Sequence, residues 1–129
     1  MSWEIDEDEA RQILALPPGE RAVTFFQLVA DWEEVWGLKD SEGWIVARET
    51  DALPLWPHSV FAASCARGAW EGAAAEAMPL GELLDDLLPR LAEDGLTVAV
   101  FPAPEEAGVV MPPAEFRERL EKELELGEW

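Results

Sequence analysis

The stretch D-W-E-E-V-W-G-L-K-D-S-E-G-W, from Asp31 to Trp44, decides the fold expected for this chain. Two runs rich in apolar residues, Glu34–Lys39 and Trp44–Glu49, flank a four-residue turn, Asp40–Gly43, that ends in glycine. Extended runs joined by a short turn of this kind predict an antiparallel β-hairpin. The stretch also holds three tryptophans within fourteen residues, so it raises the question of whether these rings serve the core or a recognition surface.

Helical patterns surround this hairpin. The spacing of apolar residues and the positions of Pro and Gly predict helices over residues 6–16, 20–30, 60–66, 79–93 and 114–126. Pro89 lies inside the leucine-rich segment 79–93 and is expected to kink it or to end its regular part early. Leu96–Phe101 and Val109–Met111 predict a second hairpin, and the small-residue segment after Gly68 is expected to be a loop. The resulting order, ααββααββα, predicts an α+β fold with helices packed on a small antiparallel sheet made of two hairpins.

Length and composition favour a single globular domain over residues 1–129. Hydrophobic residues make up 49% of the chain, but no apolar run is long enough for a transmembrane helix. The N-terminus is acidic and does not have the pattern of a secretory signal. Cys65 is the single cysteine and so cannot form an internal disulfide. We therefore expect a bacterial protein located in the cytoplasm.

Charge is the most unusual bulk property. Nine basic side chains against 28 acidic ones give a formal net charge of −19. Such a field disfavours direct binding to nucleic acid or to anionic membranes. Acidity of this kind commonly serves solubility. A sharper interpretation is a basic protein partner, such as a toxin nuclease, that complementary charge would steer to the surface.

Several motifs together resemble a known family. These are D-W-E-E-V-W from Asp31, G-W at Gly43, W-P-H at Trp56–His58 and V-F-P at Val100–Pro102, followed by an acidic final helix. Over roughly residues 25–124 the chain resembles the bacterial domain-of-unknown-function family 2750. The resemblance implies a soluble, stand-alone bacterial domain and brings no activity, cofactor or catalytic residue.

Motifs for catalysis or metal binding are weak. One His and one Cys, His58 and Cys65, do not form a zinc-ligand pattern, and no phosphate-binding or dinucleotide fingerprint is present. At helical spacing His58 and Cys65 would lie about 10 Å apart, too far for proton transfer. Cys65 is therefore interpreted as a buried structural residue and His58 as a helix N-cap. We expect no catalytic residue, no metal and no cofactor.

The tryptophans offer a different kind of site. Aromatic pairing across a hairpin would bury some of these rings, whereas an exposed ring could form a hot spot for a partner. We expect the mixed case, with part of the cluster in the core and one indole at the surface. The terminal Trp3 and Trp129 are secondary candidates.

Two functions from different classes follow. The first is a non-enzymatic binding protein, of inhibitor or immunity type, that engages a basic partner; its candidate contact residues are Trp32, Trp36, Trp44, Trp56, His58 and Arg48. The second is an enzyme or ligand-binding domain with a site near His58, Cys65 and Arg48. The first is favoured because no catalytic constellation can be assembled from the sequence. A monomer is favoured because the leucine-rich helix is expected to lie in the core.

Overall fold

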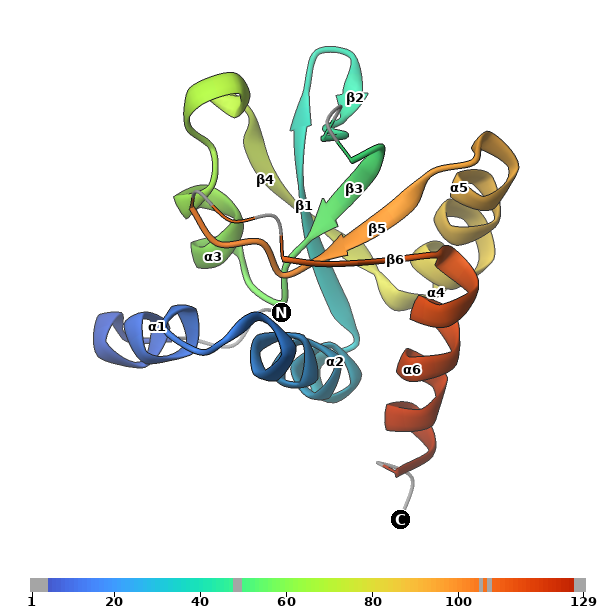
Figure 1. Cartoon of the computed structure of the whole chain (residues 1–129), viewed down its shortest axis with the longest axis horizontal. Helices are drawn as coiled ribbons and strands as arrows, with labels where there is room; N and C mark the ends of the chain where they lie inside the picture. The colour runs from blue at the N-terminus through green and yellow to red at the C-terminus, as the bar shows by residue number, and fades with distance from the viewer. Residues whose placement is uncertain (1–4, 48–49, 105, 107, 127–129) are drawn as a thin grey trace.

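The computed structural model of the chain describes residues 5–47, 50–104, 106 and 108–126 (Figure 1). Its helices are α1 (Glu7–Leu14), α2 (Pro18–Trp32), α3 (Ser59–Ser64), α4 (Leu80–Glu82), α5 (Leu88–Asp94) and α6 (Pro113–Leu126). A 3-10 turn, η1 (Gly68–Trp70), precedes β4, and a π-helical turn, η2 (Leu83–Leu87), joins α4 to α5. The strands are β1 (Glu34–Asp40), β2 (Gly43–Trp44), β3 (Ala52–Leu55), β4 (Ala74–Pro79), β5 (Thr97–Val100) and β6 (Val109–Met111).

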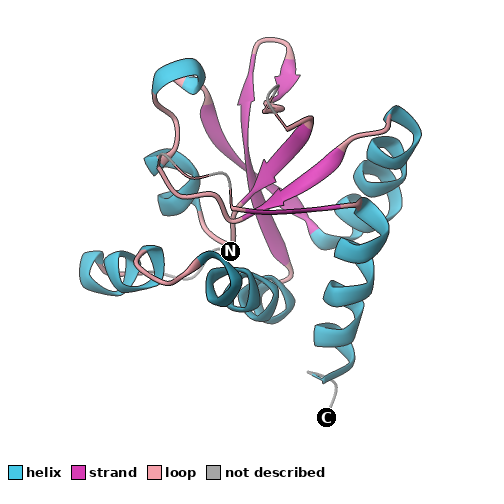
Figure 2. Cartoon of the chain, in the orientation of Figure 1, coloured by secondary structure: helices cyan, strands magenta, loops and turns pink. Residues whose placement is uncertain are grey.

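The strands form two three-stranded sheets around which the helices are arranged (Figure 2). The first sheet has the order β2-β1-β4, and both of its pairs are antiparallel. The second has the order β3-β5-β6, in which β3 and β5 are parallel and β5 and β6 antiparallel. An isolated bridge between Trp36 of β1 and Trp56, the residue after β3, connects the two sheets.

The predicted α+β class is confirmed, and the antiparallel pairs β1–β2 and β5–β6 lie where the two hairpins were expected. The second strand of the first hairpin, predicted over Trp44–Glu49, is only Gly43–Trp44 within the described residues, and the two hairpins lie in separate sheets rather than in one. Two strands were missing from the prediction. β4 occupies part of the segment that was expected to be a small-residue loop. Its alanine-rich sequence has low strand propensity, so the sequence did not reveal it, and pairing with β1 stabilises it as a strand. β3 contains Pro54 and is buried along its whole length, so it has no polar alternation to reveal it.

Local sequence explains where the helices begin and end. The Asp6 carboxylate caps α1 by accepting a hydrogen bond from the Glu9 amide at 2.7 Å. Gly95 ends α5 in the left-handed conformation (φ 73°) that favours glycine. The irregularity expected at Pro89 takes the form of η2, where the Leu88 amide reaches back five residues to the Leu83 carbonyl. No helix within the described residues is both long enough and apolar enough to cross a membrane.

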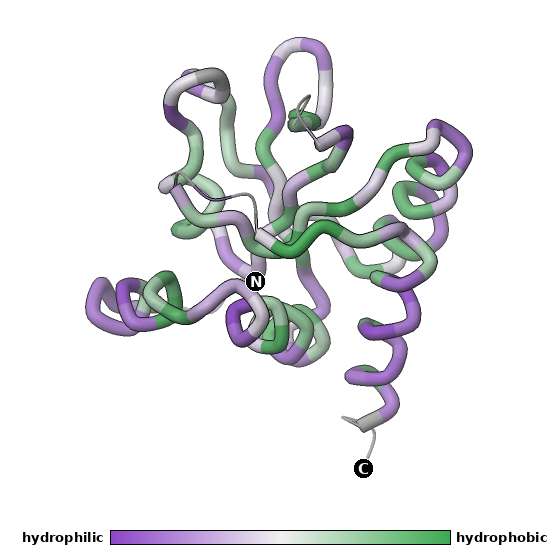
Figure 3. The backbone as a smooth tube through the Cα atoms, in the orientation of Figure 1, coloured by the Kyte–Doolittle hydropathy of each residue, from purple (hydrophilic) through white to green (hydrophobic). Residues whose placement is uncertain are grey.

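The core lies between the sheets and the inner faces of the helices. Figure 3 shows hydrophobic residues along the central strands and hydrophilic ones along much of α1 and α6. Phe25 and Phe26 of α2 pack on Phe116 of α6, with ring centroids 5.7 and 5.1 Å apart. These contacts fix α2, and with it the start of β1, against the rest of the fold.

Candidate functional site

The tryptophans proposed from the sequence occupy different environments. Trp56 is fully buried, and its indole Nε1 donates a hydrogen bond to the Pro102 carbonyl at 2.8 Å. The Trp70 ring packs edge-on against it, with centroids 6.3 Å apart. A ring without exposed surface cannot contact a partner, so Trp56 serves the core.

Trp36 and His58 lie beside each other. The half-buried Trp36 indole donates to a Glu34 carboxylate oxygen at 2.9 Å, and its ring centroid lies 6.4 Å from the His58 ring. His58 is buried and caps α3, because its Nδ1 accepts a hydrogen bond from the Val60 amide at 3.1 Å. The predicted N-cap role of His58 is confirmed, and the imidazole is thereby held in a structural position.

Trp44 packs on the first hairpin itself. Its half-buried ring lies over Gly37, where an added Cβ would come within 2.9 Å of two ring carbons. The Lys39 ammonium lies 4.9 Å from the ring centroid, a cation–π contact. Gly37 is therefore the residue that allows Trp44 to fold back on β1.

Trp32 is different, since 45% of its surface is exposed. It ends α2, and its sequence neighbours Asp31 and Glu33 are also exposed. Glu33 adopts a left-handed conformation (φ 53°), and its carbonyl accepts a hydrogen bond from the Leu80 amide at 3.3 Å. We call Asp31, Trp32 and Glu33 the Trp32 corner. The expected mixed distribution of the rings is thus found, and among the described tryptophans the most exposed one lies at a helix end rather than on the hairpin.

The residues considered for catalysis are held in structural roles or lie outside the described residues. Cys65 is buried, and its Sγ lies 3.5 Å from the Pro102 carbonyl. Burial raises the pKa of the Cys65 thiol above 9.0, so the thiol is protonated at neutral pH. Arg48, Trp3 and Trp129 lie outside the described residues. Across the described residues, no group of three or more His, Cys, Asp or Glu side chains could hold a metal ion.

Sequence reasoning missed a buried arginine. Arg21 of α2 is only 1% exposed, and it donates to the Phe101 carbonyl at 3.0 Å and to the Leu16 carbonyl at 2.9 Å. It also forms an ion pair with the half-exposed Glu106. The signal was present, because Arg21 stands four residues before Phe25 and so shares the apolar face of the helix. Its contacts fix the loop after β5 rather than a ligand.

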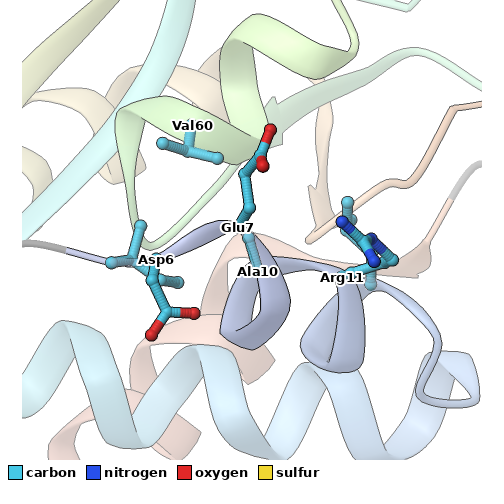
Figure 4. Close-up of a pocket in the computed structure, with 7 residues that line it drawn as sticks. Asp6, Glu7, Ala10, Arg11 and Val60 are labelled. Atoms are coloured by element: carbon cyan, nitrogen blue, oxygen red, sulfur yellow. The ribbon is translucent and has the colours of Figure 1, made fainter.

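A shallow pocket of about 270 Å³ lies between α1 and α3, and none of the described tryptophans lines it (Figure 4). Apolar side chains, among them Ala10 and Val60, line it together with the charged Asp6, Glu7 and Arg11. Asp6 already caps α1, and Arg11 pairs with Asp8. The charged groups at this pocket therefore serve the helix, and they do not converge on a common point.

The fold and these positions define an α+β protein whose buried polar groups stabilise its loops and whose most exposed tryptophan among the described residues, Trp32, stands in the sequence between two exposed acidic residues. The chain belongs to the family described as "Protein of unknown function (DUF2750)", whose family model matches residues 22–120. The resemblance inferred from the tryptophan motifs is thereby confirmed. Searches of curated proteins and of solved structures gave no match.

Proposed function

We propose that this chain is a non-enzymatic binding protein that engages a basic protein partner through the Trp32 corner. The observation that carries the proposal is the 45% exposure of Trp32, whose two neighbours in the sequence, Asp31 and Glu33, are also exposed. Tryptophan is enriched among the residues that dominate binding energy at interfaces. An exposed indole with acidic neighbours in the sequence suits a basic partner, whose Lys or Arg side chains can contact the ring face and pair with carboxylates.

The backbone of Glu33 supports this choice of surface. A left-handed conformation costs a residue with a Cβ about 1 kcal/mol relative to glycine. The position therefore carries a carboxylate where glycine would favour the fold. A strained backbone at an exposed charged residue supports a role for that side chain in binding.

Charge supports the nature of the partner. The formal net charge of −19 raises the local concentration of cationic proteins and accelerates their association, whereas it repels acidic ones. An interaction of this origin weakens as salt shortens the range of the field. The partner is therefore expected to bind tightly at low ionic strength and to be released at moderate salt.

The test is affinity capture from the lysate of the source organism at low and moderate salt, followed by mass-spectrometric identification and titration with the purified partner. A basic protein retained at low salt and released at moderate salt is the expected result. Retention of acidic proteins, or of nothing at either ionic strength, would contradict the proposal. The acidity of the chain would then be assigned to solubility.

Matched variants localise the surface. Trp32→Ala should weaken the measured affinity at least about 30-fold, as expected for a hot-spot residue. Val23→Ala is the control, because Val23 lies on the same helix and is 44% exposed. Equal affinities of the two variants for the purified partner would exclude the Trp32 corner as the binding surface.

Glu33→Gly separates binding from folding. The substitution should raise the free energy of unfolding by about 0.5–1 kcal/mol, because glycine adopts the left-handed conformation without a Cβ clash. It should also weaken partner binding, since it removes a carboxylate from the Trp32 corner. A more stable variant with unchanged affinity would show that Glu33 does not contact the partner.

A further inference from the structure

β4 presents the longest open strand edge in the described part of the fold. It is an outer strand of the sheet β2-β1-β4 and runs for six residues, whereas the other outer strands have four residues (β3), three (β6) and two (β2). α3 contacts β1 as well as β4, so it covers a face of the sheet rather than its edge. An open edge of this length is a template on which another extended chain can pair.

The hydrogen bonds of β1 identify the backbone groups on that edge. The Trp36 amide and carbonyl are bonded to Trp56, and the Leu38 carbonyl accepts from Ile45, so both residues direct their backbone groups away from β4. Their partners across the ladder are Ala77 and Ala75. In an antiparallel ladder, residues opposite such positions direct their own N–H and C=O groups outward. The amides and carbonyls of Ala75 and Ala77 therefore line the outer edge.

The side chains of β4 leave this edge accessible. Ala74, Glu76 and Ala77 are exposed and Ala75 is half-buried, so small side chains flank most of the outward groups. Pro79 ends the strand and lies opposite Glu34 at the start of β1. The Leu80 amide is bonded to the Glu33 carbonyl. One end of the β4 edge therefore lies next to the Trp32 corner.

We propose that an extended, basic segment of the partner adds to the sheet along β4, with its neighbouring residues reaching the Trp32 corner. This inference rests on the proposed function and specifies how the partner binds. The outward groups of Ala75 and Ala77 supply main-chain hydrogen bonds, and Glu76 supplies a counter-charge for a Lys or Arg of the added strand. Glu76 already forms an ion pair with the Lys39 ammonium at 3.6 Å, but both side chains are about half exposed, so a second cation can approach.

Charge selects a basic partner over a second copy of this chain. A twofold pairing of β4 through Ala75 and Ala77 would place Glu76 directly opposite its symmetry mate, which destabilises a ladder. Each copy would also bring a formal charge of −19. A strand with alternating cationic side chains reverses both effects.

The first test uses a defined probe, a capped octapeptide of alternating lysine and valine. Its control is the same peptide with every backbone amide N-methylated, which removes the donors from both edges at unchanged charge. With the first peptide at saturation, hydrogen exchange of the Ala75 and Ala77 amides, followed by NMR, should slow at least about tenfold. The N-methylated peptide should leave both rates unchanged. Binding without protection of these amides, or protection by both peptides alike, would overturn the proposal.

Variants of β4 provide the second test. Ala77→Pro removes an outward amide while leaving the ladder with β1 intact, as proline is tolerated where a strand N–H faces outward. It should weaken binding of the first peptide on the order of fivefold, the effect of one lost hydrogen bond. Ala77→Val keeps the amide and should bind like the parent chain. Thermal unfolding of both variants verifies that the fold is retained.

The outcomes separate this inference from the proposed function. If the identified partner binds Ala77→Pro as well as the parent chain but loses affinity for Trp32→Ala, the strand-addition mode is overturned and the proposed function stands. If Trp32→Ala has no effect on that partner, the Trp32 corner fails as the binding surface, irrespective of β4. If the free chain, without any peptide, has the molecular mass of a dimer in solution, the choice of a basic partner over a second copy is overturned.

Discussion

Trp36 and Trp56 exchange two backbone hydrogen bonds, each 2.8 Å long, and so join the two sheets at a single bridge. The Trp56 indole is fixed in turn to the Pro102 carbonyl. The first hairpin, the end of β3 and the loop after β5 therefore meet around one buried ring. At this bridge one edge of β1 is hydrogen-bonded to Trp56, and β4 pairs with the opposite edge of β1.

Hydrogen exchange of the free protein should reflect this arrangement. The amides of Trp36 and Trp56 lie inside the joined sheets and should exchange orders of magnitude more slowly than those of Ala75 and Ala77, which face outward. NMR-detected exchange in D₂O measures all four. Slow exchange at Ala77 in the free protein would mean that another group covers the β4 edge.

Arg21 should be indispensable for the loop after β5. Arg21→Met should lower the free energy of unfolding by about 3 kcal/mol, because the Phe101 and Leu16 carbonyls lose their donors in a buried environment. Urea unfolding measures the change. Glu106→Gln is the matched control and should cost about 1 kcal/mol or less, since Glu106 is 41% exposed and well solvated. Equal costs would indicate that the ion pair, rather than the carbonyl contacts, stabilises the loop.

Gly108 is required by the same loop. Its φ of 76° and the position of the Val100 carbonyl, 2.5 Å from where a Cβ would lie, leave no room for a side chain. Gly108→Ala should lower the free energy of unfolding by about 3 kcal/mol. Gly81→Ala, at an open position in α4, should instead raise it by up to about 1 kcal/mol. Denaturant unfolding of both variants measures these changes. An unchanged free energy of unfolding in Gly108→Ala would show that the loop can rearrange to accept a side chain.

Cys65 should make stability fall in alkaline solution. Burial raises the pKa of its thiol in the folded chain above 9.0, so the unfolded chain loses this proton first. The contribution of the protonated thiol is complete below about pH 8 and is lost as pH rises through the higher pKa of the folded chain. Unfolding of the parent chain and of Cys65→Ala, compared from about pH 8 to about pH 10, should show their difference shrinking. A constant difference would show that the thiol does not titrate in this range.

Much of the site could be read from the sequence only as a set of alternatives. The His58 N-cap follows from a local pattern of Pro57, His58 and Ser59 before a helix, and the structure confirms it. The choice among the tryptophans could not be made, because Trp32, Trp36 and Trp56 have equal hydrophobicity and differ only in which distant residues cover them. Arg21 was missed because its burial depends on a hydrogen bond to the Phe101 carbonyl, which is distant in the sequence and cannot be inferred from a local pattern.

The sequence by itself determined what depends on neighbouring residues. Periodicity, caps and turn residues specified the helices α1, α2, α5 and α6, the hairpins β1–β2 and β5–β6 and therefore the α+β class. Only the tertiary structure decided that Ala74–Pro79 forms a strand, that β3 lies parallel to β5, and that Trp32 keeps an exposed ring while Trp56 is buried. The physical reason is that these features are stabilised by pairing and packing between segments distant in sequence, which no local pattern encodes.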